Sequence, residues 1–129
     1  MGMAEKNPER SERITASVAL QGLGGHSSVP FKTHNPVTAG FEFIHTVTAR
    51  LWYEFDSFDN VALYPVGFDA GTKANIIPDT ASIQLRLEYA AAGQGEKLKH
   101  IVQTSLEALK ALYSVDYTVE FSEAAHGRF

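Results

Sequence analysis

The sequence contains no cysteine, so it can form neither disulfides nor thiolate metal sites. It also has little excess charge, because 11 Lys and Arg residues against 15 Asp and Glu residues give a formal net charge of -4. Binding to a nucleic-acid phosphate backbone requires clustered Lys and Arg side chains, and the net negative charge disfavours it. We therefore expect no nucleic-acid partner. Its polar opening lacks the apolar core of a signal peptide, so we expect no membrane association and take the cytoplasm as the default location.

Familiar catalytic motifs are missing as well. Zinc sites often show as close pairs such as His-x-x-x-His on one helix, and none of the five histidines forms such a pair. His45, His100 and His126 are expected on helix surfaces or in the tail. The sequence has no Gly-x-Ser-x-Gly turn and no phosphate-binding glycine loop. We therefore expect no metal site, no bound cofactor and no catalysis from this chain alone.

The composition is that of one globular domain, since 129 residues with 44% hydrophobic residues can bury a single core. We expect a leader without fixed structure over residues 1–12, a domain over residues 13–122 and a tail over residues 123–129. Four segments have the alternation or composition of strands: residues 14–20, 61–68, 81–89 and 115–121. Pro65 cannot donate to a ladder, which places the second segment at a sheet edge.

Two amphipathic helices separate these strands. Asn35 followed by Pro36 is typical of a helix N-cap and first turn. The apolar stripe predicted for this first helix consists of Val37, Phe41, Ile44, Thr48, Leu51 and Phe55. The stripe of the second helix consists of Leu98, Ile101, Val102, Ser105, Leu109 and Leu112. The first helix carries Phe43, Val47 and Trp52 in excess of one packed face, so we expect these three residues to meet a second copy of the chain.

The order strand, helix, strand, strand, helix, strand predicts an α+β fold of the ferredoxin-like βαββαβ type. Right-handed crossovers would place both helices on one face of a four-stranded antiparallel sheet. The third strand agrees, because its apolar residues alternate with Ser82, Gln84, Arg86 and Glu88. We expect these four polar residues on a solvated face.

Two loops are more specific than connections require. Residues 22–30 read Gly-Leu-Gly-Gly-His-Ser-Ser-Val-Pro, and residues 71–79 read Gly-Thr-Lys-Ala-Asn-Ile-Ile-Pro-Asp. With the Asn-Pro-Val helix start and the order of elements, they resemble the dimerisation domain of the aminoacylase, glutamate carboxypeptidase and desuccinylase family. This is metallopeptidase family twenty, and the motifs are most similar to its amidohydrolase branch. The resemblance covers residues 14–121.

The resemblance implies a dimerisation and substrate-covering domain of a metal-dependent hydrolase that cleaves the amide bond of N-acyl amino acids or small peptides. The parent catalytic domain, to which the tail would lead back, would carry two zinc or similar divalent ions. The implied partners are a second copy of the chain and this catalytic domain. His26 would reach the partner's active site and stabilise the oxyanion. Asn75 would contact substrate, and Gly24, Gly25, Pro30, Gly71 and Pro78 would shape the loops.

One position departs from the family pattern. Many members place an arginine nine residues after the Asp of the Ile-Pro-Asp motif, where it holds a substrate carboxylate, and this chain has Glu88 there. Arg86 lies on the same face and could replace it, with its reach displaced by about 7 Å. The alternative is that Arg86 and Glu88 are a solvated pair of surface charges. For His26, the alternative is a histidine that only caps its glycine turn.

Two other functions fit the predicted fold. The first is a free-standing ferredoxin-like module that binds a small ligand or a protein and has no parent enzyme. The second is an RNA-binding sheet, which would need exposed aromatic residues where Ser82, Gln84, Arg86 and Glu88 stand. The two matching loops favour the hydrolase domain over both.

Overall fold

The computed structural model describes residues 9–124. Most of the predicted leader and tail, with His126, therefore lies outside the described residues. The elements are β1 (Glu12–Gln21), β2 (Gly25–His26), the 3-10 helix η2 (Pro30–Lys32), α1 (Pro36–Glu54), β3 (Ala62–Asp69), β4 (Ile76–Ile77), β5 (Thr80–Tyr89), α2 (Gln94–Tyr113) and β6 (Asp116–Ala124). The four long strands were all predicted from the sequence, whereas β2 and β4 were predicted as loops.

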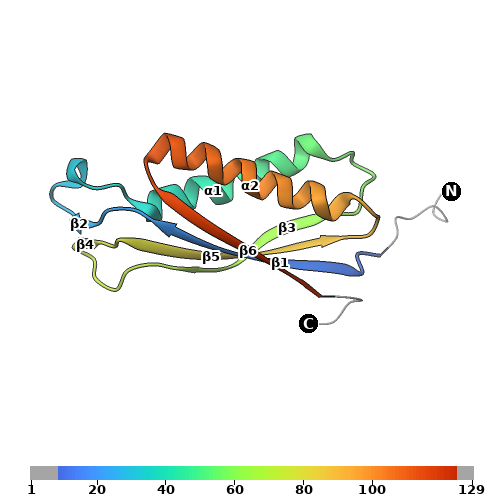
Figure 1. The fold of residues 1–129 in the computed structure, drawn as a ribbon, viewed down its shortest axis with the longest axis horizontal. Coiled ribbons are helices and arrows are strands. Elements are labelled where there is room, and N and C mark those ends of the chain that lie inside the picture. Colours follow the sequence, from blue (N-terminus) through green and yellow to red (C-terminus); the bar gives the residue numbers. More distant parts are fainter. Residues whose placement is uncertain (1–8, 125–129) are drawn as a thin grey trace.

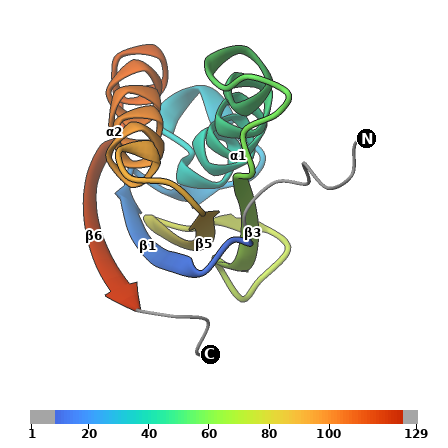
Figure 2. The same cartoon turned by 90° about the vertical axis from the view of Figure 1, so that its right-hand side faces the viewer.

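The main sheet has the order β3-β5-β1-β6, and all its neighbouring strands are antiparallel. Both helices cover one face of this sheet, and the other face is open (Figure 1). Viewed along the strands, α1 lies over the β3 side of the sheet and α2 over the β6 side (Figure 2). The predicted ferredoxin-like α+β fold and the edge position of β3 are confirmed.

Alternation along β1 and β5 places their apolar residues under the helices. Ile14, Ala16, Val18 and Leu20 of β1 are buried, and so are Ala81, Ile83, Leu85 and Leu87 of β5. The register pairs Val18 with Ile83 and Ala16 with Leu85, which puts these residues in one layer. A period of two on both strands therefore builds the floor of the core.

The start of α1 follows the predicted chemistry. The Asn35 side chain accepts a hydrogen bond from the backbone N–H of Val37 at 2.9 Å, and Pro36 occupies the first turn. The side chain thus satisfies one of the N–H groups that a helix start leaves without a partner.

The face of α1 that packs on the sheet differs from the predicted stripe. Its buried residues are Pro36, Ala39, Gly40, Phe43 and Val47. Phe41 and Thr48 of the predicted stripe are exposed, while Ile44, Leu51 and Phe55 pack at the margin of the core. The prediction that Phe43 and Val47 lie outside the core is therefore wrong, and only Trp52, at 81% exposure, faces outward as expected.

Small residues decide which side of α1 faces the sheet. Ala39 and Gly40 are both buried, and a Cβ added to Gly40 would come within 2.7 Å of the Phe68 ring and 3.1 Å of Ile83. The helix can approach the sheet closely only on the side where no larger residue stands. Phe43 and Val47 lie on that same side one and two turns further along.

The inner face of α2 largely matches the predicted stripe. Leu98, Ile101, Val102, Ser105 and Leu109 are buried as expected. Leu106 is also buried, whereas Leu112 is 72% exposed, so the prediction for Leu112 is wrong. The helix ends at Ser114, which has the left-handed φ of 56° that terminates many helices.

Arg50 joins the two helices. Its guanidinium donates to the Ile101 carbonyl at 3.1 Å, to the Ser105 hydroxyl at 3.0 Å and to the Thr104 hydroxyl. It also holds Glu54 one turn further along α1, with N–O distances of 3.1 and 2.8 Å. This hydrogen bond from Arg50 lowers the pKa of Glu54. The contacts fix how far the helices can slide past each other.

Among the described residues, no helix combines the length and the hydrophobicity that crossing a membrane requires.

Candidate functional site

The fold brings the two predicted motif loops together as a small two-stranded sheet. β2 and β4 pair antiparallel, with Gly25 opposite Ile77 and His26 opposite Ile76. This pair extends beyond the end of the main sheet, where β1 and β5 finish at the pair Gln21 and Thr80 (Figure 1). We call residues 22–30 together with residues 71–79 the site arm. The sequence did not predict the pairing that forms this arm.

Asp79 anchors the site arm to the main sheet. Its backbone carbonyl accepts from the N–H of Gly22 at 2.7 Å, and its side chain accepts from the N–H of Gly24 at 2.8 Å. Gly24 is required by space, since a Cβ there would lie 2.1 Å from the carbonyl oxygen of Ile77. Leu23 pairs instead with His34, at 2.9 and 2.8 Å, which holds the start of α1 against the arm.

The other residues predicted to shape the loops have definite places in the site arm. Gly71 has a φ of 68°, a left-handed conformation that favours glycine, and it lies beside the ring of Pro78. Pro30 starts the 3-10 helix η2. At Gly25, an added Cβ would lie 3.2 Å from the Thr33 methyl group.

His26 lies at the end of β2 with its side chain exposed. Its Nδ1 atom is 3.1 Å from the backbone nitrogen of Ser28 and 2.8 Å from the Ser28 hydroxyl. The carbonyl of His26 accepts from the N–H of Val29 at 3.1 Å, which closes a tight turn over residues 26–29. The ring is therefore held on one side only, and its Nε2 edge is directed away from this turn.

Asn75 lies in the opposite half of the arm, in the turn directly before β4. Its backbone carbonyl accepts from the N–H of Ser27 at 3.0 Å, and its side chain is exposed. This bond fixes the backbone of Asn75 next to the His26 turn. The structure thus brings together His26 and Asn75, which are 49 positions apart in the sequence.

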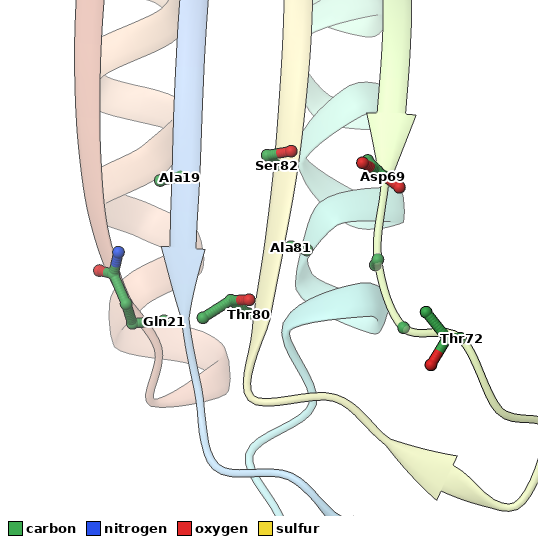
Figure 3. Close-up of a pocket in the computed structure, with 9 residues that line it drawn as sticks. Ala19, Gln21, Asp69, Thr72, Thr80, Ala81 and Ser82 are labelled. Carbon is green, nitrogen blue, oxygen red and sulfur yellow. The ribbon is translucent and has the colours of Figure 1, made fainter.

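A polar hollow of about 390 Å³ lies where the site arm leaves the open face of the sheet. Figure 3 shows the side chains of Gln21, Thr80, Ser82, Asp69 and Thr72 around it. Three hydroxyl groups, one amide and one carboxylate line the hollow, so it can form hydrogen bonds with a polar ligand. This hollow could not be recognised from the sequence, because it is formed by the ends of three strands that are far apart in the chain.

Arg86 lies elsewhere, in the interior of β5, and is not brought to the arm. It is six residues beyond Thr80, which corresponds to about 20 Å along a strand. Its guanidinium is 4.0 Å from Glu88, which is 6% exposed and also meets Arg10 at 3.2 Å and Arg13 at 3.9 Å. The interpretation of Glu88 as a solvated surface charge is therefore wrong.

The carboxylate of Glu88 is enclosed by Arg10, which precedes β1, and by Arg13 of β1. Tyr64 of β3 also contacts it. The Tyr64 hydroxyl donates to the Glu88 carboxylate at 2.7 Å, and this hydrogen bond, together with burial, raises the pKa of Tyr64. A buried carboxylate needs such partners, because an uncompensated charge is costly. Periodicity alone placed Glu88 on the open face and could not show that its neighbours would enclose it.

No group of three or more His, Asp or Glu side chains among residues 9–124 is placed to hold a metal ion. In the described part of the chain, the candidate functional features are an exposed histidine on an anchored arm, a neighbouring asparagine and a polar hollow.

This combination of fold and arm defines a dimerisation domain of the peptidase type. A family model described as "Peptidase dimerisation domain" matches residues 9–114, and the chain belongs to this family, a domain of family-twenty metallopeptidases. The chain is 26% identical over 118 residues to a succinyl-diaminopimelate desuccinylase of Rickettsia bellii. The match covers 90% of this chain and 30% of the relative. The same enzyme of Paracoccus denitrificans is 27% identical over 112 residues, covering 85% of this chain and 29% of the relative.

Solved structures share the fold at lower identity. A structure from methicillin-resistant Staphylococcus aureus has a TM-score of 0.84 at 20% identity, over 92% of this chain and 32% of that one. An aminobenzoyl-glutamate utilization protein from Klebsiella pneumoniae has a TM-score of 0.78 at 15% identity, over 95% and 31%. A hydantoinase/carbamoylase family amidase from Burkholderia ambifaria has a TM-score of 0.80 at 10% identity, over 95% and 31%. The chain thus spans about a third of the proteins it matches.

Proposed function

We propose that this chain is the dimerisation and substrate-covering domain of a metal-dependent amidohydrolase that cleaves the amide bond of N-acyl amino acids or small peptides. The observation that carries this proposal is the anchored arm, which presents the exposed His26 beyond the end of the sheet, beside a polar hollow. The family match and the desuccinylase relatives support the reaction class. The catalytic domain would be the part of those proteins that this chain does not span.

His26 would act in the active site of the partner subunit. Its ring contributes little to packing because it is exposed, and its free edge can donate a hydrogen bond to a carbonyl oxygen. A donor aimed at the charge that develops on this oxygen stabilises the transition state by about 3 kcal/mol. Asn75, directly before the facing strand β4, would contact the same substrate.

Arg86 would contribute to substrate binding from within its own subunit. His26 would cross the two-fold axis, so the strand length of about 20 Å that separates Arg86 from the arm in one chain does not prevent the two residues from serving one site. Arg86 lies on the open face, with 22% of its side chain exposed. We propose that it holds a substrate carboxylate there.

The partner subunit would be a second copy that pairs through α1 and the β3 edge. Phe41, His45, Thr48 and Trp52 are exposed and lie on one stripe of α1. The ring of Phe41 packs on Phe68 of β3 with 5.2 Å between centroids, so this stripe borders the edge strand. Tyr64 and Val66 of β3 are also exposed, and an edge strand has backbone groups free to pair.

The metals, two zinc or similar divalent ions, would be held by the catalytic domain and would activate the attacking water. This chain would supply binding, orientation and oxyanion stabilisation. We expect the purified chain to bind no zinc stoichiometrically, and we place the parent enzyme in the cytoplasm.

Hybrid dimers of the intact enzyme test whether His26 acts in the active site of the partner subunit. Replacing His26 by Ala should lower kcat about a hundredfold or more, with dimerisation and metal content unchanged. A dimer that pairs a His26→Ala subunit with one lacking its metal ligands should keep about half the activity, because one complete site remains. A dimer of a wild-type subunit with one carrying both defects should be inactive. The opposite pattern would show that His26 acts within its own chain.

A further inference from the structure

The contacts of His26 determine which of its ring nitrogens carries the proton. The backbone nitrogen of Ser28 lies 3.1 Å from Nδ1, and a backbone N–H can only donate a hydrogen bond. Nδ1 must therefore present its lone pair to Ser28. In a neutral imidazole one nitrogen is protonated and the other is not, so the proton resides on Nε2.

The Ser28 hydroxyl has the same role as its backbone. Its oxygen lies 2.8 Å from Nδ1. Because Nδ1 offers a lone pair, the hydroxyl must donate toward it rather than accept from it. Two donors from one residue therefore face a single ring nitrogen, and the backbone N–H, which cannot accept, is the one that opposes a proton on Nδ1.

The geometry of the turn keeps Ser28 in this position. The carbonyl of His26 accepts from the N–H of Val29 at 3.1 Å, and Ser27 donates its N–H to the Asn75 carbonyl at 3.0 Å. The turn is thus closed on itself and is also bonded to the residue directly before β4. The ring orientation follows from backbone structure and does not require a bound substrate.

We infer that Ser28 is a positioning residue that fixes His26 as the Nε2–H tautomer, so that the exposed edge of the ring is a hydrogen-bond donor and not a base. The tautomer follows from this chain alone, whereas its catalytic consequence rests on the proposed function. A donor at Nε2 suits a carbonyl oxygen that gains negative charge. It cannot accept a proton from water or from a nucleophile in this state.

The tautomer can be measured on the 129-residue chain. Long-range 1H–15N spectra would be recorded on the 15N-labelled chain at about pH 8.5, where an ordinary histidine is neutral. A His26→Gln variant assigns the resonances. We expect Nε2 of His26 to have the 15N chemical shift of a protonated nitrogen and Nδ1 that of a nitrogen with a lone pair. The difference between the two shifts should be larger than for His45, which is exposed on α1.

Variants of the turn test the part played by Ser28. Ser28→Ala removes the hydroxyl and should reduce the difference in 15N chemical shift between the two His26 nitrogens. Ser28→Thr should restore this difference. Ser27→Ala is the matched control, because the exposed Ser27 contributes its backbone N–H to the arm, and it should leave the spectrum unchanged. A proton on Nδ1 would overturn the tautomer, and a His26 spectrum identical in Ser28→Ala would overturn the role of Ser28.

A double-mutant cycle in the intact enzyme tests the consequence for catalysis. Ser28→Ala should lower kcat about three- to tenfold with KM little changed, as expected for the loss of one neutral hydrogen bond. The same change in a His26→Ala background should have no further effect, because Ser28 acts through the ring. An equal loss in both backgrounds would contradict the inference. If the spectra are as expected but His26→Ala keeps full activity, the proposed function fails and the tautomer stands.

Discussion

The two helices have nearly the same length, yet their outer faces differ. Toward solvent α2 presents mostly charged and amide side chains: Glu96, Lys97, Gln103, Glu107 and Lys110. By contrast, α1 presents aromatic rings, with Phe41 at 62%, Trp52 at 81% and Tyr53 at 85% exposure. Both helices bury an apolar face against the same sheet. This difference supports the proposed dimer contact through α1, because exposed aromatic rings favour a second packing partner and a charged outer face does not.

The largest expected effect concerns the inner face of α1. Phe43 is fully buried, so Phe43→Ala should lower the free energy of unfolding by about 3–5 kcal/mol. Phe41→Ala is the control, and it should cost less than about 1 kcal/mol because Phe41 lies on the outer stripe. Urea denaturation at a chain concentration low enough for the monomer to prevail would measure both values, since self-association also stabilises the fold. Comparable losses would place Phe41 in the core and contradict the assignment of the two faces.

A smaller effect is expected where the two helices meet. Arg50→Ala removes a cation that bonds the Ile101 carbonyl and two hydroxyls of α2 and leaves Glu54 without its partner. We expect a loss of about 2–3 kcal/mol in the free energy of unfolding. Arg50→Lys should fall between this variant and the original chain, because an ammonium group keeps the charge but cannot bond in several directions. A change below about 0.5 kcal/mol for Arg50→Ala would show that packing alone joins the helices.

The smallest expected effect separates the outer faces of the two helices. Trp52→Ser should weaken self-association about tenfold or more in Kd, because large aromatic residues dominate such interfaces. Leu112→Ser is the matched control on α2, since Leu112 is also exposed, at 72%, and this change should leave Kd unaltered. Sedimentation velocity over a concentration series measures both. Equal weakening by the two changes would remove the distinction between the helices.

The sequence predicted the order of elements, the sheet and the edge strand, because strand alternation and the helix N-cap at Asn35 are local signals. It did not predict which side of α1 faces the sheet. This helix has apolar residues on most of its circumference, so periodicity favours several stripes equally. The decisive residues are Ala39 and Gly40, whose small size allows close approach, and apolar periodicity does not weigh size.

For the site, the motifs identified His26 and Asn75 but not the arrangement that joins them. β2 and β4 have two residues each, which is too short for any alternation to be visible. The pairing depends on Asp79, which bonds two backbone N–H groups at long sequence separation. Glu88 shows a further limit, because its burial depends on Arg10 and Arg13, which come from another part of the chain.

The two halves of the site arm have unequal lengths between the main sheet and the β2–β4 pair. The main sheet ends at the pair Gln21 and Thr80, and pairing resumes at Gly25 and Ile77, so three residues on one side stand opposite two on the other. When one strand has one residue more than its partner, the side chains beyond that point change faces relative to their numbers. The register pairs His26 with Ile76, whose even number matches Thr80 and Ser82 of the open face rather than the buried Ala81 and Ile83. We expect that deleting one residue between Gln21 and Gly25 would shift this register and displace the histidine, although every residue of the motif from Gly25 onward would be intact.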